Sequence, residues 1–107
     1  MKYRNLYINK LEPFDIIIPI KDASGNPVNL TGYEGQMKFA KHYESSTKYN
    51  VEVSVQNASE GLIRCFMNGE DTQILPTAIM VYSLFIISPT DVYTLYQQGE
   101  VVVNPTI

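Results

Sequence analysis

An apolar run that follows a proline constrains this chain more than any other stretch. Residues 71–75 read DTQIL, Pro76 follows, and residues 77–87 read TAIMVYSLFII. Proline ends a helix because it lacks the backbone N–H and its ring clashes with the preceding turn. A continuous apolar run bounded by such breakers is typical of a strand in the middle of a sheet. We predict a helical turn over 69–75, capped by Asn68 with help from Asp71, and then a buried strand over 78–87.

The rest of the chain is organised as short segments in which apolar and polar residues alternate. Pro19 cannot donate to a ladder and confines its segment to an edge or a bulge, and residues 97–99 predict a kink in the last strand. Turn residues separate the segments roughly every ten residues, which favours an antiparallel sandwich or barrel. We predict an all-β protein of about seven strands, folded as one domain over 1–107. The predicted strands, besides 78–87, are 3–9, 14–20, 33–41, 51–56, 61–67 and 92–103.

Composition excludes several classes of protein. The formal net charge is −3 and no basic stripe exists, so we expect no nucleic-acid partner. The hydrophobic fraction of 45% is too high for a disordered chain. Residues 1–10 lack the apolar core of a signal peptide, and the longest apolar window is too short to span a bilayer. We therefore expect a soluble, unprocessed chain without a membrane partner.

No group of residues predicts a reaction. His42 is the only histidine and Cys65 the only cysteine, so neither a disulfide nor a histidine-rich metal site can form within the chain. Cys65 alternates with Ile63 and Met67, which predicts a buried, structural thiol. Glu70 and Asp71 are neighbours in sequence and do not face each other on a helix. We predict no catalytic residue, no cofactor and no metal.

The outward faces of two strands carry the clearest surface signal. If Met80, Tyr82, Leu84 and Ile86 face the core, their neighbours face away, and the same holds for the neighbours of Ile63, Cys65 and Met67. Together the outward apolar residues would form a patch larger than a monomer tolerates. We predict that another protein buries it, the alternative being burial under the loop 21–32. The candidate interface residues are Leu62, Phe66, Val81, Phe85 and Ile87.

The eight tyrosines are the most unusual feature of the composition. Apart from Tyr82 they are spread over the termini, the loops and the last strand. Exposed tyrosines suit contact surfaces because they bring area at low entropic cost. Three readings stay open: a protein contact surface, simple scatter around the ends of the fold, and stacking on sugar rings.

Four segments in order resemble small immunoglobulin-like domains of tailed-phage virions. They are GNPVNLTGYEGQMKF (25–39), EGLIRCFM (60–67), EDTQILPTAIMVYSLFI (70–86) and the final GEVVVNPT (99–106). Such domains serve as tail, baseplate or fibre-attachment modules. The resemblance implies an immunoglobulin-like antiparallel β-sandwich and a structural, non-enzymatic role.

Two details of the resemblance concern the central strand. Thr77 and Ala78 replace the small residue and glycine of such domains, and Phe85 and Ile87 stand where polar residues are expected, which gives this face a local role. In true immunoglobulin domains a tyrosine of this strand bonds back to the turn before it. Tyr82 is either such a corner or a core aromatic with another partner.

The resemblance implies a component of the virion, assembled in the host cytoplasm. We expect first a tail, baseplate or fibre-attachment protein, and as the second choice a head decoration protein. Its partners would be other virion proteins, with self-association into a ring as one form, and residues 1–10 and 101–107 are candidates for strand addition to a neighbour. A carbohydrate-binding module and an inhibitor of a host protein are the alternatives from other classes.

Overall fold

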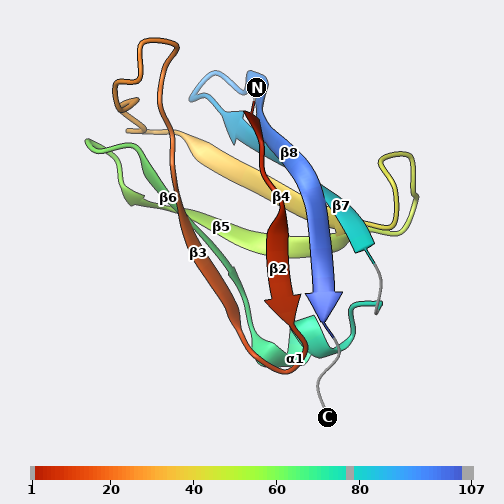
Figure 1. Ribbon diagram of the computed structural model, residues 1–107. Helices are drawn as coiled ribbons and strands as arrows, with labels where there is room; N and C mark the ends of the chain where they lie inside the picture. Colours follow the sequence, from red (N-terminus) through yellow and green to blue (C-terminus); the bar gives the residue numbers. More distant parts are fainter. Residues whose placement is uncertain (1, 77–78, 105–107) are drawn as a thin grey trace.

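The computed structural model describes residues 2–76 and 79–104, which form eight strands and one helical turn (Figure 1). The expected all-β fold with a single short helix is confirmed. In chain order the elements are β1 (Lys2–Tyr3), β2 (Leu6–Asn9), β3 (Phe14–Pro19), β4 (Glu34–Ala40), β5 (Tyr49–Asn57), β6 (Leu62–Met67), α1 (Gly69–Gln73), β7 (Ile79–Ile87) and β8 (Tyr93–Asn104).

The strands form a curled sheet of two layers. Their order is β1-β8-β7-β4-β5-β6-β3, and β2 also pairs with β8. Residues 49–51 of β5 pair with β4, whereas residues 52–57 pair with β6, so β5 passes from one layer to the other. We name β1, β2, β8, β7 and β4 sheet A, and β6, β3 and the second part of β5 sheet B. Neighbouring strands are antiparallel except that β1 and β2 run parallel to β8.

The core lies between the two sheets and is built by the alternation in each strand. Phe39 of sheet A packs edge-on against Phe14 of sheet B, with ring centroids 5.9 Å apart, and against Tyr82 at 6.5 Å. The predicted core positions are confirmed, because every member of both sets is buried. Each such side chain contributes about 1.5–3 kcal/mol relative to leaving it exposed. The confirmed positions are Ile63, Cys65, Met67, Met80, Tyr82, Leu84 and Ile86.

The helical turn forms where the sequence predicts it. The Asn68 side chain accepts a hydrogen bond of 2.8 Å from the backbone N–H of Asp71 and so caps α1. Thr72 is fully buried, and its hydroxyl donates to the carbonyl oxygen of Glu12. The predicted strand over 78–87 begins at Ile79 among the described residues; positions 77 and 78 lie outside them. β7 pairs with β4 on one side and β8 on the other, which confirms its central place.

The predicted first strand is interrupted between β1 and β2. There the hydroxyl of Tyr82 donates to the carbonyl oxygen of Arg4 at 2.7 Å and accepts from the Gln97 amide at 2.8 Å. A Cβ on Gly99 would collide with the Arg4 carbonyl oxygen, so the crossing requires glycine at this position. The interpretation of Tyr82 as a corner is wrong, because the N-terminal segment supplies the carbonyl that its hydroxyl reaches.

The predicted irregularity in the last strand is present one residue early. Leu84 pairs with Gln97 and Phe85 with Leu95, so Tyr96 is the extra residue of a bulge. The Tyr96 hydroxyl donates to the Pro19 carbonyl oxygen and accepts from the N–H of Lys21, both at 3.1 Å. The bulge therefore ties β8 to the end of β3, which is an edge strand as its proline predicts.

We expect Tyr82→Phe to lower the free energy of unfolding by about 1–3 kcal/mol, because the Arg4 carbonyl and the buried Gln97 amide lose their shared partner. Urea unfolding followed by circular dichroism measures the loss. Tyr93→Phe is the matched control, since Tyr93 is 56% exposed. Equal stability of both variants would contradict a stabilising role for this hydroxyl.

We expect the thiol of Cys65 to be inert in the folded protein. Burial raises the pKa of Cys65 to about 12, and the thiolate is the reactive form. A disulfide reagent at about pH 8, close to the ordinary pKa of a free thiol, should react only after urea is added. Rapid reaction without urea would show that the strand β6 opens readily.

Candidate functional site

The outer face of sheet A carries an uncovered apolar row that crosses three strands. Tyr7 of β2 pairs with Val102 of β8, and Val102 pairs with Ile79 of β7. All three side chains point away from the core, because their strand neighbours point into it. Tyr7 is 67% exposed and Ile79 59%, and Val102 between them is half-buried.

The rows that follow along sheet A alternate between apolar and polar character. Val81 pairs with Ala40, and the next row contains Ser83 and Lys38. Gln98 of β8 donates from its side-chain amide to the Ser83 hydroxyl at 3.1 Å. Farther along, Phe85 packs edge-on against Tyr93, with ring centroids 6.1 Å apart. The face therefore has apolar ends and a polar middle.

Two more tyrosines border this face. Tyr3 pairs in register with Gln98, and the Tyr43 hydroxyl lies 3.5 Å from the Gly99 carbonyl oxygen, to which it donates. Partial burial, with the nearby Tyr3 and Glu100, raises the pKa of Tyr43. Tyr3 is 76% exposed and Tyr43 50%. Other tyrosines pack against the core instead, namely Tyr33, Tyr49 and Tyr96.

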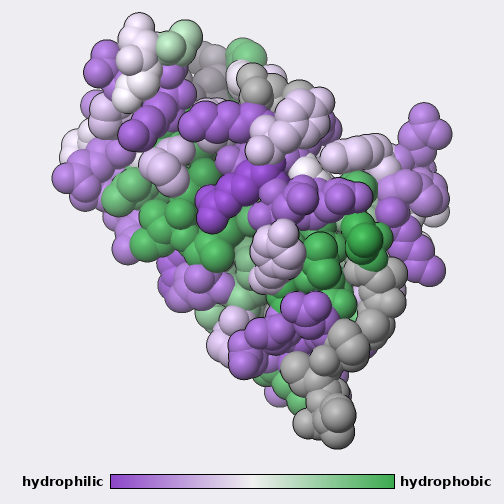
Figure 2. Space-filling view, in the orientation of Figure 1, coloured by the Kyte–Doolittle hydropathy of each residue, from purple (hydrophilic) through white to green (hydrophobic). Residues whose placement is uncertain are grey.

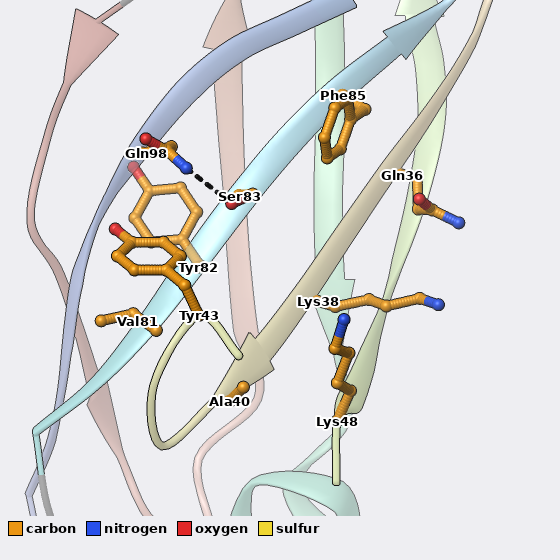
Figure 3. A pocket seen from close by; sticks show the side chains of 10 residues that line it. All are labelled: Gln36, Lys38, Ala40, Tyr43, Lys48, Val81, Tyr82, Ser83, Phe85 and Gln98. Atoms are coloured by element: carbon orange, nitrogen blue, oxygen red, sulfur yellow. Dashed lines mark hydrogen bonds between the residues drawn. The ribbon is translucent and has the colours of Figure 1, made fainter. Parts of the chain in front are cut away.

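A pocket of about 350 Å³ lies on the outer face of sheet A beside the loop 41–48. Figure 3 shows Tyr43 and Gln98 on one side of it, Lys38 and Lys48 on the other, and β7 running between them. β4, β7 and β8 supply most of the lining, and the loop adds Tyr43 and Lys48. The complete lining is Gln36, Lys38, Ala40, Tyr43, Lys48, Val81, Tyr82, Ser83, Phe85 and Gln98.

Leu62 and Phe66 lie on the outer face of sheet B, on the other side of the core from Val81 and Phe85. The expectation that all the outward apolar residues form one patch is therefore wrong. The reason is that β5 carries the chain from one sheet to the other before β6 begins. On sheet B, Arg64 lies over the ring of Phe66 at 4.9 Å and forms a two-pronged ion pair with Asp15 at 2.7 and 2.9 Å.

Ile87 is buried, with 8% of its surface exposed, and is not available as an interface residue. It pairs with Glu34 and Tyr93 at the end of sheet A, beside the turn 88–92. The Ser88 N–H donates to the Val92 carbonyl oxygen at 3.0 Å and folds that turn back at the end of β7. Val81, Phe85, Leu62 and Phe66 are half-buried.

The loop 21–32 does not contribute to the pocket lining. It is anchored elsewhere: Leu30 is buried, and its N–H donates to the Ala58 carbonyl oxygen. The described parts of the two terminal segments pair with each other, since β1 and β2 run alongside β8; positions 1 and 105–107 lie outside the described residues. That the terminal segments add as strands to a neighbour stays a prediction, and among the described residues it concerns the sheet edge formed by β1 and β2.

Figure 2 shows the side of the molecule on which β3, β2 and β8 lie in front. Apolar side chains gather there in two areas, one over β3 and one beside the lower half of β8, with polar side chains between them. On β3, Ile17 is 46% exposed. The outer surfaces of the two sheets thus remain separate at this edge.

No candidate metal site is present in the described part of the chain. Residues 2–76 and 79–104 contain no group of three or more histidine, cysteine or acidic residues that could hold a metal ion. Within the same residues, no helix has the length and apolar character needed to cross a membrane. The face on sheet A offers apolar and aromatic area, two amines and two amides.

Sequence reasoning missed Tyr7, Ile79 and Val102 as one surface. Each alternates with buried neighbours, and that signal could have placed them outside the core. What the sequence did not supply was the strand order, which brings residues 7, 79 and 102 into one row. The lysines of the pocket were missed for the same reason.

Comparison with known proteins shows the fold. No family model and no curated protein matches the chain. The N-terminal domain of phage TP901-1 ORF48 is similar in structure, with a TM-score of 0.59 and 9% identity over 96% of this chain and 97% of that one. The extracellular domain of the voltage-gated sodium channel β4 subunit is also similar in structure, with a TM-score of 0.55 and 10% identity over 100% of this chain and 95% of that one. The chain thus has an immunoglobulin-like β-sandwich fold, as the sequence resemblance implies.

The ion pair between Arg64 and Asp15 on sheet B leads to a prediction about the pKa of Asp15. The hydrogen bond from Arg64 holds the pKa of Asp15 below its ordinary value of 3.8. Its stabilising effect is therefore present above that value and is lost as pH falls through the folded-state pKa. We expect Arg64→Gln to raise the pKa of Asp15 toward 3.8, as measured by NMR titration of the carboxyl carbon. Lys41→Gln, which removes a cation of the loop 41–48, should leave it unchanged.

Proposed function

We propose that this chain is a non-enzymatic structural protein of a bacteriophage particle, a tail, baseplate or fibre-attachment component that acts through protein–protein contacts. In this proposal residues 1–107 act as one domain and reside in the virion. Two findings support it: the sequence resemblance to virion domains, and the similarity in fold to the N-terminal domain of phage TP901-1 ORF48 over nearly the whole of both chains.

The observation that carries the proposal is the uncovered row on the outer face of sheet A. Tyr7 and Ile79 expose more than half of their surface although they stand in paired strands next to Val102. Contiguous exposed apolar and aromatic area marks interaction surfaces. Tyr3 and Tyr43 extend this area. We assign this face, including Val81 and Phe85, to a contact with another virion protein.

The partner can also be a second copy of the chain, as in a ring. A structure of the similar fold of the sodium channel β4 subunit is described as a parallel homodimer that explains cell–cell adhesion. That description supports the general capacity of the fold for self-association. The second candidate is a carbohydrate-binding module, favoured by Tyr3, Tyr7 and Tyr43 on one face, because aromatic rings combine an apolar face with a polar tip.

We expect Ile79→Asp to reduce incorporation of the chain into particles at least about tenfold, which corresponds to about 1.4 kcal/mol of contact free energy. The charge would lie within the proposed contact and would have to be desolvated. Particles purified from a host that supplies only the variant are measured by quantitative mass spectrometry.

Ile17→Asp is the matched control, since Ile17 is 46% exposed on the outer face of sheet B. It should be incorporated normally, and both variants should unfold at the temperature of the unmodified chain. Absence of the unmodified chain from purified particles would contradict the proposed function. Equal incorporation of the two variants would contradict the choice of face.

A further inference from the structure

The pocket on sheet A is cationic although the chain as a whole is acidic. Its lining contains Lys38 and Lys48 and no carboxylate, whereas the formal net charge of the chain is −3. The ion pair that the described residues form is Arg64 with Asp15, on the opposite sheet. Neither lysine of the pocket therefore has a carboxylate within 4 Å in that part of the chain. Their charges are available to an external anion.

The backbone holds Lys38 in place. It stands in the middle of β4, paired with Ser83 of β7 and Asn50 of β5, and is half-buried. Lys48 approaches from the end of the loop 41–48, and Figure 3 shows both lysines on the same side of the pocket. One amine thus comes from a strand and the other from a neighbouring loop, and both line the same pocket.

The remaining lining suits a peptide. Val81 and Ala40 give an apolar lining at one end of the pocket and Phe85 at the other, with Ser83 between them. The amides of Gln36 and Gln98 offer acceptors and donors for a backbone, and Gln98 is already oriented by its bond to Ser83. A volume of about 350 Å³ is within the usual range of roughly 300–1,000 Å³ for ligand sites and exceeds what one small anion fills.

We propose that this pocket docks an acidic segment of a partner protein. A Glu or Asp carboxylate of that segment lies between Lys38 and Lys48, and an apolar side chain of the same segment packs on Phe85. The identity of the partner as a particle protein rests on the proposed function, whereas the pocket chemistry does not. Charge complementarity favours an acidic segment, because a basic segment would place its amines against those of Lys38 and Lys48.

The test uses the chain labelled with ¹⁵N and two peptides, acetyl-Glu-Leu-Glu-amide and its neutral match acetyl-Gln-Leu-Gln-amide. Amide shifts are followed by NMR up to about 10 mM peptide, a range suited to weak docking. We expect the acidic peptide to shift the amides of Gln36, Lys38, Ser83 and Gln98, and to bind at least about fivefold more tightly than the neutral one. Raising the ionic strength from about 0.05 M to about 0.5 M should weaken it.

The variant pair K38Q/K48Q should bind the acidic peptide at least about fivefold more weakly. The pair K21Q/K41Q changes the net charge equally outside the pocket and should bind as the unmodified chain does. The peptide acetyl-Lys-Leu-Lys-amide, which requires no variant, should not bind.

Several results would overturn the inference: no shift with the acidic peptide, equal binding of the neutral peptide, shifts confined to other surfaces, or undiminished binding by K38Q/K48Q. Sodium phosphate that competes as strongly as the peptide would reduce the pocket to a simple anion site and would also overturn it. Peptide docking by a chain absent from particles would retain the pocket and reject the proposed function. If the chain is present in particles but does not bind the acidic peptide, the proposed function is retained and the docking proposal is rejected.

Discussion

The bond from the Tyr82 hydroxyl to the Arg4 carbonyl oxygen determines where the N-terminal strand lies. The hydroxyl is buried and serves two groups, the Arg4 carbonyl and the Gln97 amide, so neither is left unsatisfied. Gly99 makes the approach possible, since any Cβ there would collide with the same carbonyl. The strand β2 is thereby held against β8, and Tyr7 completes the row with Val102 and Ile79. The proposed contact surface therefore depends on a buried polar interaction below it.

The passage of β5 between the layers gives the two outer faces different chemistry. On sheet B, Arg64 is engaged within the chain by the carboxylate of Asp15 and the ring of Phe66. On sheet A, Lys38 is in register with Ser83 and Asn50, neither of which is a carboxylate, and Tyr43 lines the other side of the pocket. A cation that is already paired with a carboxylate of its own chain gains little from a partner. A cation without such a pair can gain free energy when a partner supplies the carboxylate.

Alternation alone predicted the fold class and most of the core, because each strand has its own inward and outward set: Ile63, Cys65 and Met67 were placed correctly without any knowledge of their neighbours. The candidate site was predicted only in part, since Val81 and Phe85 belong to the face, Leu62 and Phe66 lie on the opposite sheet, and Ile87 is covered. These errors share a physical cause. Which strands pair is decided by contacts distant in sequence, and the partner of Tyr82 lies 78 residues away from it.

The division of the sheet A face into apolar and charged parts suggests how a contact there obtains both strength and selectivity. Burial of the row around Ile79 supplies free energy in proportion to area and with little regard to the partner's identity. A carboxylate between Lys38 and Lys48 adds less net free energy, because its own desolvation offsets much of the attraction. The carboxylate mainly determines the orientation and the identity of the partner. The apolar row can pack against many surfaces, whereas the two amines disfavour any surface that places a cation or an unpaired donor against them.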